Sequence, residues 1–198
     1  TTIGICLTPL ISFVPYDYPD FWSRLHHVVN SSGWTIIDAQ YGHEFGQNPL
    51  EDTLLSIESG IISVMPPSLI PSHPSHVEFP GVLQASSPRI QENITFYSNQ
   101  TGLPSQFGYS NARSMILLST GLYAPPGEQV YATMSSDLID SGALLQVGVH
   151  SDTLWHKSTI YRFPSIVRSF AIESANISIA NAFGGPIYLA VPPEDPLG

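Results

Sequence analysis

The stretch NISIANAFGGPIYLAVP, residues 176–192, contains two short apolar runs separated by turn-forming residues. The runs NISIA and PIYLAVP fit β-strands. Between them, Asn181, Gly184 and Gly185 are residue types that tolerate the backbone conformations of a sharp reversal. The stretch therefore predicts two consecutive strands joined by a tight connection.

Five earlier runs are also short and fit β-strands, and turn-forming residues separate them. They are NITFYS (93–98), ARSMILLS (112–119), EQVYATM (128–134), ALLQVGVH (143–150) and RSFAIES (168–174). Pro125, Pro126 and Gly127 form a proline-supported β-turn signal between two of these runs. Because the runs are closely spaced and show no helical period, we predict an antiparallel, jelly-roll-like β-sandwich over residues 77–193, followed by a tail at residues 194–198.

Residues 1–66 show a different order of patterns. Apolar runs typical of buried strands alternate with stretches of helical spacing. The strand-like runs are TIGICL (2–7), WTIIDAQ (34–40) and IISVMP (61–66), and the helical stretches are residues 18–33 and 48–60. Asn48 is the expected N-cap of the second helix, and Gly60 is its expected end. This order predicts a small βαβαβ parallel sheet with right-handed crossovers, part of a larger doubly wound domain.

MPPSLIPSHPSH, residues 65–76, lies between these two regions. Its prolines oppose a helix and favour an extended backbone. We therefore predict an α/β segment at residues 1–66, a proline-rich linker at residues 67–76 and the sandwich after it. The expected fold class is α+β with more than one domain.

The charge balance excludes one class of partner. The chain has 6 basic and 16 acidic residues, with a formal net charge of −10. Nucleic-acid binding requires clustered Lys and Arg, so nucleic acid is not an expected partner. No apolar run approaches the roughly 20 residues that span a bilayer, so we expect no transmembrane segment.

The only indication of the protein's cellular location comes from possible N-glycosylation sites. Asn30, Asn93, Asn99 and Asn176 each begin an Asn-x-Ser/Thr sequon. Used sequons imply an extracellular or secreted protein, whereas chance occurrence in a Ser-rich chain leaves a cytoplasmic protein that reaches a membrane through a partner. The chain begins with Thr1 and shows no signal peptide, as expected of a processed product or a trimmed fragment.

Local signatures of catalysis are absent from the sequence. His43-Glu44 begins like the helical zinc motif His-Glu-x-x-His, but Gln47 stands where the second histidine is required. No Gly-x-Ser-x-Gly nucleophile elbow occurs, and Cys6, the single cysteine, lies in an apparent buried strand. We therefore expect no bound metal or cofactor and no enzymatic activity of this chain alone.

The run GVHSDTLWHK, residues 148–157, is the densest group of chemically versatile side chains. Together with two nearby arginines it forms a candidate loop for a ligand or partner, with an aromatic and basic rim. Its candidate residues are His150, Asp152, Trp155, His156, Lys157, Arg162 and Arg168. The alternative interpretation is a structural loop with solvated charges.

Four ordered segments carry a family resemblance. They are STGLYAPPGEQV (119–130), VGVHSDTLWHK (147–157), RFPSIVRSFAI (162–172) and IANAFGGPIYLAVPP (179–193). Their order and spacing resemble the β-sandwich that precedes the catalytic module in enhancin-like, mucin-degrading zinc metallopeptidases and in the TRP-channel-associated factors. The resemblance covers roughly residues 77–193.

The resemblance implies an accessory role. The zinc-binding helix of that family lies downstream of the sandwich, so no catalytic residue is transferred to this chain. The expected function is to support or orient a neighbouring catalytic or peptidase-like domain or chain. Two alternatives remain open: a module that binds mucin-type glycans, and the non-catalytic chain of a processed two-chain zinc metallopeptidase.

Overall fold

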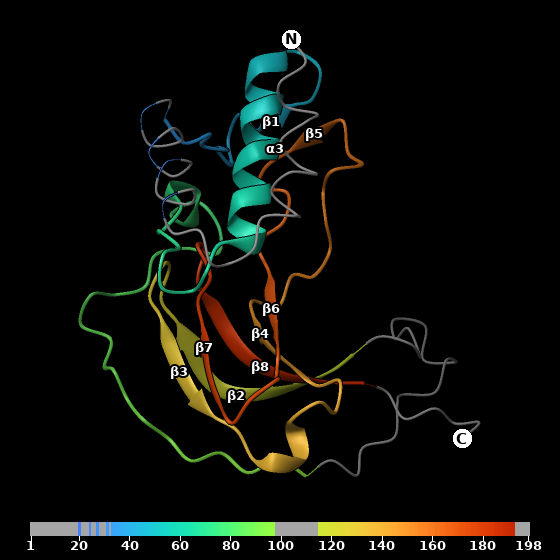
Figure 1. Ribbon diagram of the computed structural model, residues 1–198. Coiled ribbons are helices and arrows are strands. Elements are labelled where there is room, and N and C mark those ends of the chain that lie inside the picture. The colour runs from blue at the N-terminus through green and yellow to red at the C-terminus, as the bar shows by residue number, and fades with distance from the viewer. Residues whose placement is uncertain are drawn as a thin grey trace, which may run out of the picture.

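The computed structural model describes residues 33–97 and 115–192, together with Asp20, Arg24, His27 and Ser31. Figure 1 shows one long helix beyond one end of a group of β-strands. The elements in chain order are β1 (His43–Glu44), α3 (Pro49–Val64), the 3-10 helix η1 (Pro74–His76), β2 (Ile116–Ala124), β3 (Val130–Thr133), the 3-10 helix η2 (Ser136–Leu138), β4 (Leu144–Val147), β5 (Thr159–Ile160), β6 (Arg168–Ala171), β7 (Asn176–Ile179) and β8 (Gly185–Val191).

The β-strands form antiparallel sheets around an apolar core. One sheet has the order β2-β8-β4-β6, and β3 pairs with β7 in a second sheet. Buried side chains from both sheets meet in one cluster: Ala124, Ala143, Leu145, Val147, Ile172, Ile179, Ile187 and Leu189. This two-layered arrangement confirms the predicted sandwich-like β domain in its general form.

The reversal at residues 181–185 carries the chain from one sheet to the other. Strand β7 ends in the two-stranded sheet, whereas β8 lies between β2 and β4 in the larger sheet. Gly184 has a φ of 67°, and its amide donates to the carbonyl of Asn181 at 3.1 Å. The expected reversal is therefore confirmed, and it connects two layers of the sandwich.

All but one of the predicted sandwich strands overlap an observed strand. The exception is the run 93–98, because residues 93–97 form no strand. Within that run, Phe96 packs against the sandwich core, while its neighbours Thr95 and Tyr97 are exposed. A single anchored side chain holds this segment to the core without any strand pairing.

The predicted βαβαβ segment is not found in the described residues. Residues 34–40 form no strand, and residues 61–64 continue α3. Helix α3 begins as expected, since the side chain of Asn48 accepts from the amide of Leu50, but it passes through Gly60. The predicted strand at residues 2–7 lies outside the described residues.

Helical packing explains why residues 61–64 are not a strand. Leu55, Ile61, Ile62 and Met65 are buried. Together with the buried Glu58 they recur at the three- and four-residue spacing of one helix face. Burial of this apolar face outweighs the weak helix propensity of Gly60, which is about 1 kcal/mol less favourable than alanine in a helix interior.

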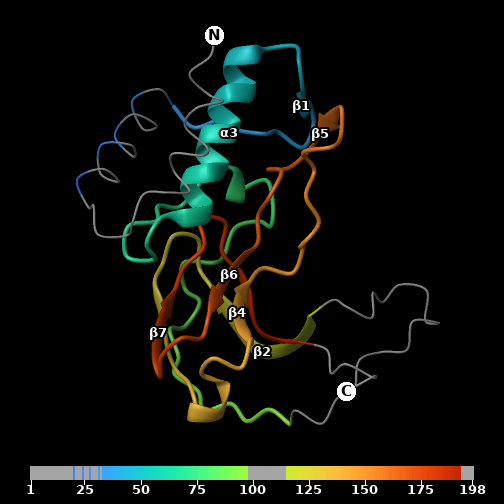
Figure 2. The same ribbon diagram turned by 45° about the vertical axis from the view of Figure 1, so that its right-hand side comes forward.

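The proline-rich segment 67–76 packs into the protein interior. Ile70, His73 and Ser75 are buried, and the segment ends in the short helix η1. A second apolar cluster contains Ile70 together with α3 side chains and Phe163 and Phe183 of the sandwich region. Figure 2 shows the same placement of α3 next to the end of the sheets. The boundaries at residues 66 and 77 stay predictions, but the segment between them is no exposed connector.

Candidate functional site

Part of the predicted loop converges on one aromatic ring. The ring of His150 lies 5.0 Å from that of Phe79, and the guanidinium carbon of Arg162 lies 5.7 Å from the same ring. Arg162 Nη2 also pairs with Asp152 Oδ2 at 2.7 Å. His150, Asp152 and Arg162 thus form a connected group around Phe79, a residue that the sequence pattern did not identify.

The remaining residues of the loop, Trp155, His156 and Lys157, lie away from Phe79. Trp155 is 38% exposed and its ring lies 5.8 Å from that of Phe45, next to β1. His156 and Lys157 are exposed. The amide of Lys157 donates to the carbonyl of Leu154, which closes a turn at the tip of the loop.

Arg168 is not part of the exposed rim. Its side chain is buried, and its guanidinium donates to the carbonyls of Met65 and Ala180 and lies 4.6 Å from the ring centroid of Phe170. Buried arginines are held by such hydrogen bonds. Arg168 therefore ties the end of α3 to the sandwich.

The sequons fall into two groups. Asn93 and Asn176 are exposed, and the side-chain oxygen of Asn176 accepts from Thr133 Oγ1 at 3.2 Å. Asn30 and Asn99 lie outside the residues whose side chains are described. Use of any of them as a glycosylation site stays a prediction.

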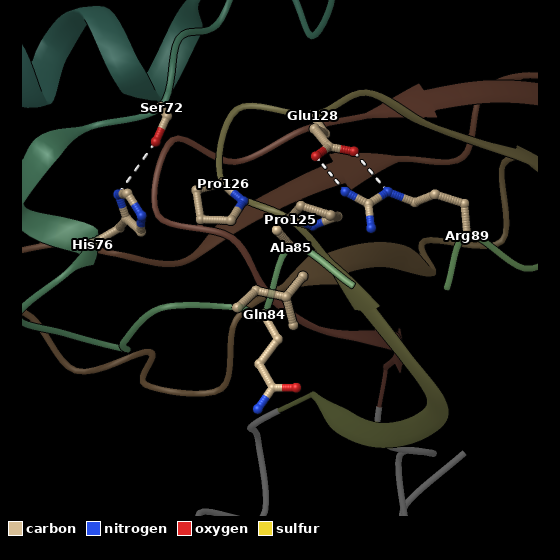
Figure 3. A pocket seen from close by; sticks show the side chains of 9 residues that line it. Ser72, His76, Gln84, Ala85, Arg89, Pro125, Pro126 and Glu128 are labelled. Carbon is tan, nitrogen blue, oxygen red and sulfur yellow. Dashed lines mark hydrogen bonds and ion pairs between the residues drawn. The ribbon is translucent and has the colours of Figure 1, made fainter. Parts of the chain in front are cut away.

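An open cleft of about 280 Å³ lies where η1, the segment after it and the β2–β3 turn meet. Figure 3 shows this cleft, which we call the proline cleft because two adjacent prolines lie at its centre. It is lined by Ser72, His76, Leu83, Gln84, Ala85, Arg89, Pro125, Pro126 and Glu128. No sequence pattern indicates this cleft, because residues 72–89 meet the β2–β3 turn at residues 125–128 only in the folded chain.

A charged pair forms one end of the proline cleft. Arg89 Nε donates to Glu128 Oε2 at 2.9 Å and Arg89 Nη2 donates to Glu128 Oε1 at 2.5 Å. These hydrogen bonds with Glu128 raise the pKa of Arg89 above its usual value. Both side chains are about half exposed, and such surface pairs contribute little to stability. The pair instead fixes two polar groups in one plane at the cleft wall.

A serine and a histidine form the other end. Ser72 Oγ lies 3.2 Å from His76 Nδ1, a spacing that suits a nucleophile and its base. However, His76 Nδ1 also lies 2.8 Å from the carbonyl oxygen of His73. Because a carbonyl only accepts, Nδ1 carries a hydrogen and cannot remove the proton of Ser72. The arrangement does not activate a serine nucleophile.

Gly127 positions the proline turn against the other wall. Its φ of 70° is in the left-handed region, and a Cβ there would clash with the backbone nitrogen of Ser72. Gly127 also donates its amide to the carbonyl of Asn181 at 2.9 Å. Only glycine allows both the turn and this close approach.

The described part of the chain has neither a cluster of metal-ligating side chains nor a membrane-spanning helix. Among residues 33–97 and 115–192, no three His, Cys, Asp or Glu side chains are grouped so that they could hold a metal ion. In the same part of the chain, no helix is both long and apolar enough to cross a membrane.

One family of known proteins matches the part of the chain that contains the sandwich. The sequence profile of the N-terminal domain of M60-like peptidases matches residues 89–197. A TRPM8 channel-associated factor homolog of Danio rerio is 30% identical over 77 residues, which are 39% of this chain and 8% of that protein. A homolog of Xenopus laevis is 32% identical over 80 residues, or 40% of this chain and 9% of that protein.

The human relative gives a similar result. TRPM8 channel-associated factor 1 of Homo sapiens is 28% identical over 81 residues, which are 41% of this chain and 9% of that protein. The chain therefore spans only a small fraction of the length of these curated relatives. No solved structure matches the chain.

Proposed function

Because the chain belongs to the family of N-terminal domains of M60-like peptidases, we propose that it is a non-catalytic accessory domain that orients a neighbouring peptidase or peptidase-like domain. The observation that carries this proposal is the family match, which includes every strand of the four-stranded sheet and both strands of the β3–β7 sheet. The similarity to TRPM8 channel-associated factors supports the same kind of role, because the aligned region is a small part of those long proteins.

The loop at residues 148–157 is the proposed contact surface. The ion pair between Asp152 and Arg162 and the contact of His150 with Phe79 fix the loop backbone before any partner binds. A pre-organised loop loses less conformational entropy on binding than a flexible one. Exposed Trp155 and Lys157 would then be available to a partner, and tryptophan is a frequent anchor in interfaces.

Cross-linking of the natural protein can test this surface, because Lys157 is the only lysine in the chain. We expect an amine-reactive cross-linker to join Lys157 to the peptidase or peptidase-like domain, as read by mass spectrometry. The matched control is the double variant Lys157→Arg/Glu173→Lys, which moves the lysine to an exposed position after β6. Equal cross-linking from position 173 would contradict the proposed surface.

The same preparation tests the non-catalytic role. A co-purifying chain with the zinc motif would identify a two-chain peptidase. Cleavage of casein or mucin by the purified chain alone, with zinc present, would contradict the accessory role.

We also propose an extracellular or secreted location. The exposure of Asn93 and Asn176 supports it, since an oligosaccharyltransferase requires accessible sequons. Intact-mass measurement of natural material before and after treatment with an N-glycosidase is expected to show a mass loss that Asn93→Gln reduces. An unchanged mass would favour the cytoplasmic alternative.

A further inference from the structure

We propose that the proline cleft binds one ring of a neutral saccharide. This inference goes beyond the accessory role, because it requires no peptidase partner. Pockets that enclose drug-sized ligands measure about 300–1,000 Å³. The proline cleft, at about 280 Å³ and open to solvent, suits a single small polar ring.

The charged end of the cleft can both donate to and accept from a hydroxyl group. A guanidinium has five N–H donors, and Arg89 uses Nε and Nη2 for Glu128 and Nη1 for the carbonyl of Ser87. One hydrogen remains on each Nη atom, and each oxygen of Glu128 retains a free lone pair. A hydroxyl group both donates and accepts, so this planar pair matches its chemistry.

The opposite end of the cleft also provides one hydrogen-bond donor and one acceptor, through Ser72 and His76. His76 Nδ1 donates to the carbonyl of His73, which leaves Nε2 of the neutral ring as an acceptor. Because Ser72 Oγ faces this donor nitrogen, the hydroxyl hydrogen of Ser72 is free to donate. Figure 3 shows these two residues across the prolines from Arg89 and Glu128.

The floor between the two ends is apolar. Pro125 and Pro126 lie at the centre of the cleft, and Leu83 also lines it, whereas the amide of Gln84 points away from both polar ends. Sugar rings have apolar C–H faces as well as hydroxyl edges. An apolar floor between two hydrogen-bonding ends therefore accommodates a sugar ring better than a fully polar metabolite.

The charge distribution of the cleft and of the whole chain favours an uncharged ligand. The charges of Arg89 and Glu128 compensate each other within the cleft. The chain as a whole has a formal net charge of −10, which disfavours the approach of anions. A neutral hexose or N-acetylhexosamine is therefore expected, and an acidic sugar is not.

NMR titration of the whole chain with methyl glycosides of neutral hexoses and N-acetylhexosamines tests the proposal. We expect saturable shifts at the Arg89 Nε–H and the Gly127 amide, with dissociation constants in the millimolar range. Glu128→Gln and Arg89→Lys should each weaken binding about tenfold, because each disrupts the planar pair. The control Glu92→Gln changes an exposed carboxylate that does not line the cleft, and it should leave binding unchanged.

Other outcomes would overturn the proposal. They are shifts centred on Trp155, tighter binding of the methyl glycoside of N-acetylneuraminic acid than of any neutral sugar, or no saturable shift with any glycoside. Equal thermal melting temperatures of the three variants would show that lost binding does not reflect unfolding. Comparing a methyl glycoside with a glycopeptide that ends in the same sugar separates recognition of a free sugar from recognition of a glycoprotein. These results are independent of the Lys157 cross-links.

Discussion

Replacing His73 by alanine is expected to lower the free energy of unfolding by about 3–5 kcal/mol. His73 and Glu58 are both fully buried, and His73 Nε2 lies 3.2 Å from Glu58 Oε2. The amide of Ser75 donates to His73 Nδ1 at 3.1 Å, so the hydrogen of the neutral ring is on Nε2 and points to Glu58. Removing the ring leaves a buried carboxyl group without this donor and creates a cavity among aromatic side chains.

Urea denaturation followed by tryptophan fluorescence measures this effect, because the ring of Trp34 lies 4.8 Å from that of His73. His76→Ala is the matched control, since His76 is only partly buried and should cost less than about 1 kcal/mol. Glu58→Gln keeps a side-chain oxygen that accepts from the amide and hydroxyl of Thr35, which reach Glu58 Oε1 at 2.8 and 3.1 Å. It also places an NH2 group opposite the Nε2 hydrogen of His73, so this variant should lower the free energy of unfolding as well. Equal stability of the His73 and His76 variants would show that the buried pair contributes nothing.

The second large effect is expected for Asn181→Ala, at about 3 kcal/mol. The buried amide of Asn181 donates to the carbonyls of Val147 and Ile166 at 3.1 and 2.8 Å, and its oxygen accepts from the amide of Phe183 at 3.2 Å. These partners belong to three separate segments of the chain. Alanine would leave their buried polar groups unpaired, and each such group is costly.

Asn176→Ala is the control for this variant, because Asn176 is exposed and should change stability by less than about 0.5 kcal/mol. Hydrogen exchange of the Phe183 and Gly184 amides adds a local measurement. Asn181→Asp retains the acceptor for Phe183 but loses both donors, so it should also destabilise the protein. A stable Asn181→Asp variant would contradict the importance of the two donated bonds.

The sequence predicts those features correctly that depend on residues only a few positions apart, such as turns and helix caps. The Asn and Gly residues at 181–185 and the Pro-Pro-Gly turn determine backbone conformation within a few positions, and both were identified. Asn48 was recognised as a cap for the same reason. Residues 61–64 were misassigned because a short apolar run fits a buried strand and a buried helix face equally well.

The candidate sites depended on contacts that no local pattern encodes. The pairing of Asp152 with Arg162 spans 10 residues and lies within the predicted loop, whereas Phe79 comes from another segment. The sequence places Arg168 in the rim because Lys157, Arg162 and Arg168 lie within twelve positions. In the folded chain its guanidinium is buried and donates to the carbonyl of Met65 at the end of α3. Arg89 and Glu128 are 39 residues apart, so only the folded chain joins them.

The apolar cluster beneath α3 crosses the start of the region that matches the peptidase family. Leu55 and Ile61 lie outside the region shared with the peptidase family, and they pack in the same cluster as Phe163 and Phe183 inside it. A fragment that begins at residue 89 would lack α3. It would therefore expose to solvent the apolar side chains that α3 covers in the whole chain. The family match therefore begins at residue 89, whereas the apolar packing extends back to Leu55.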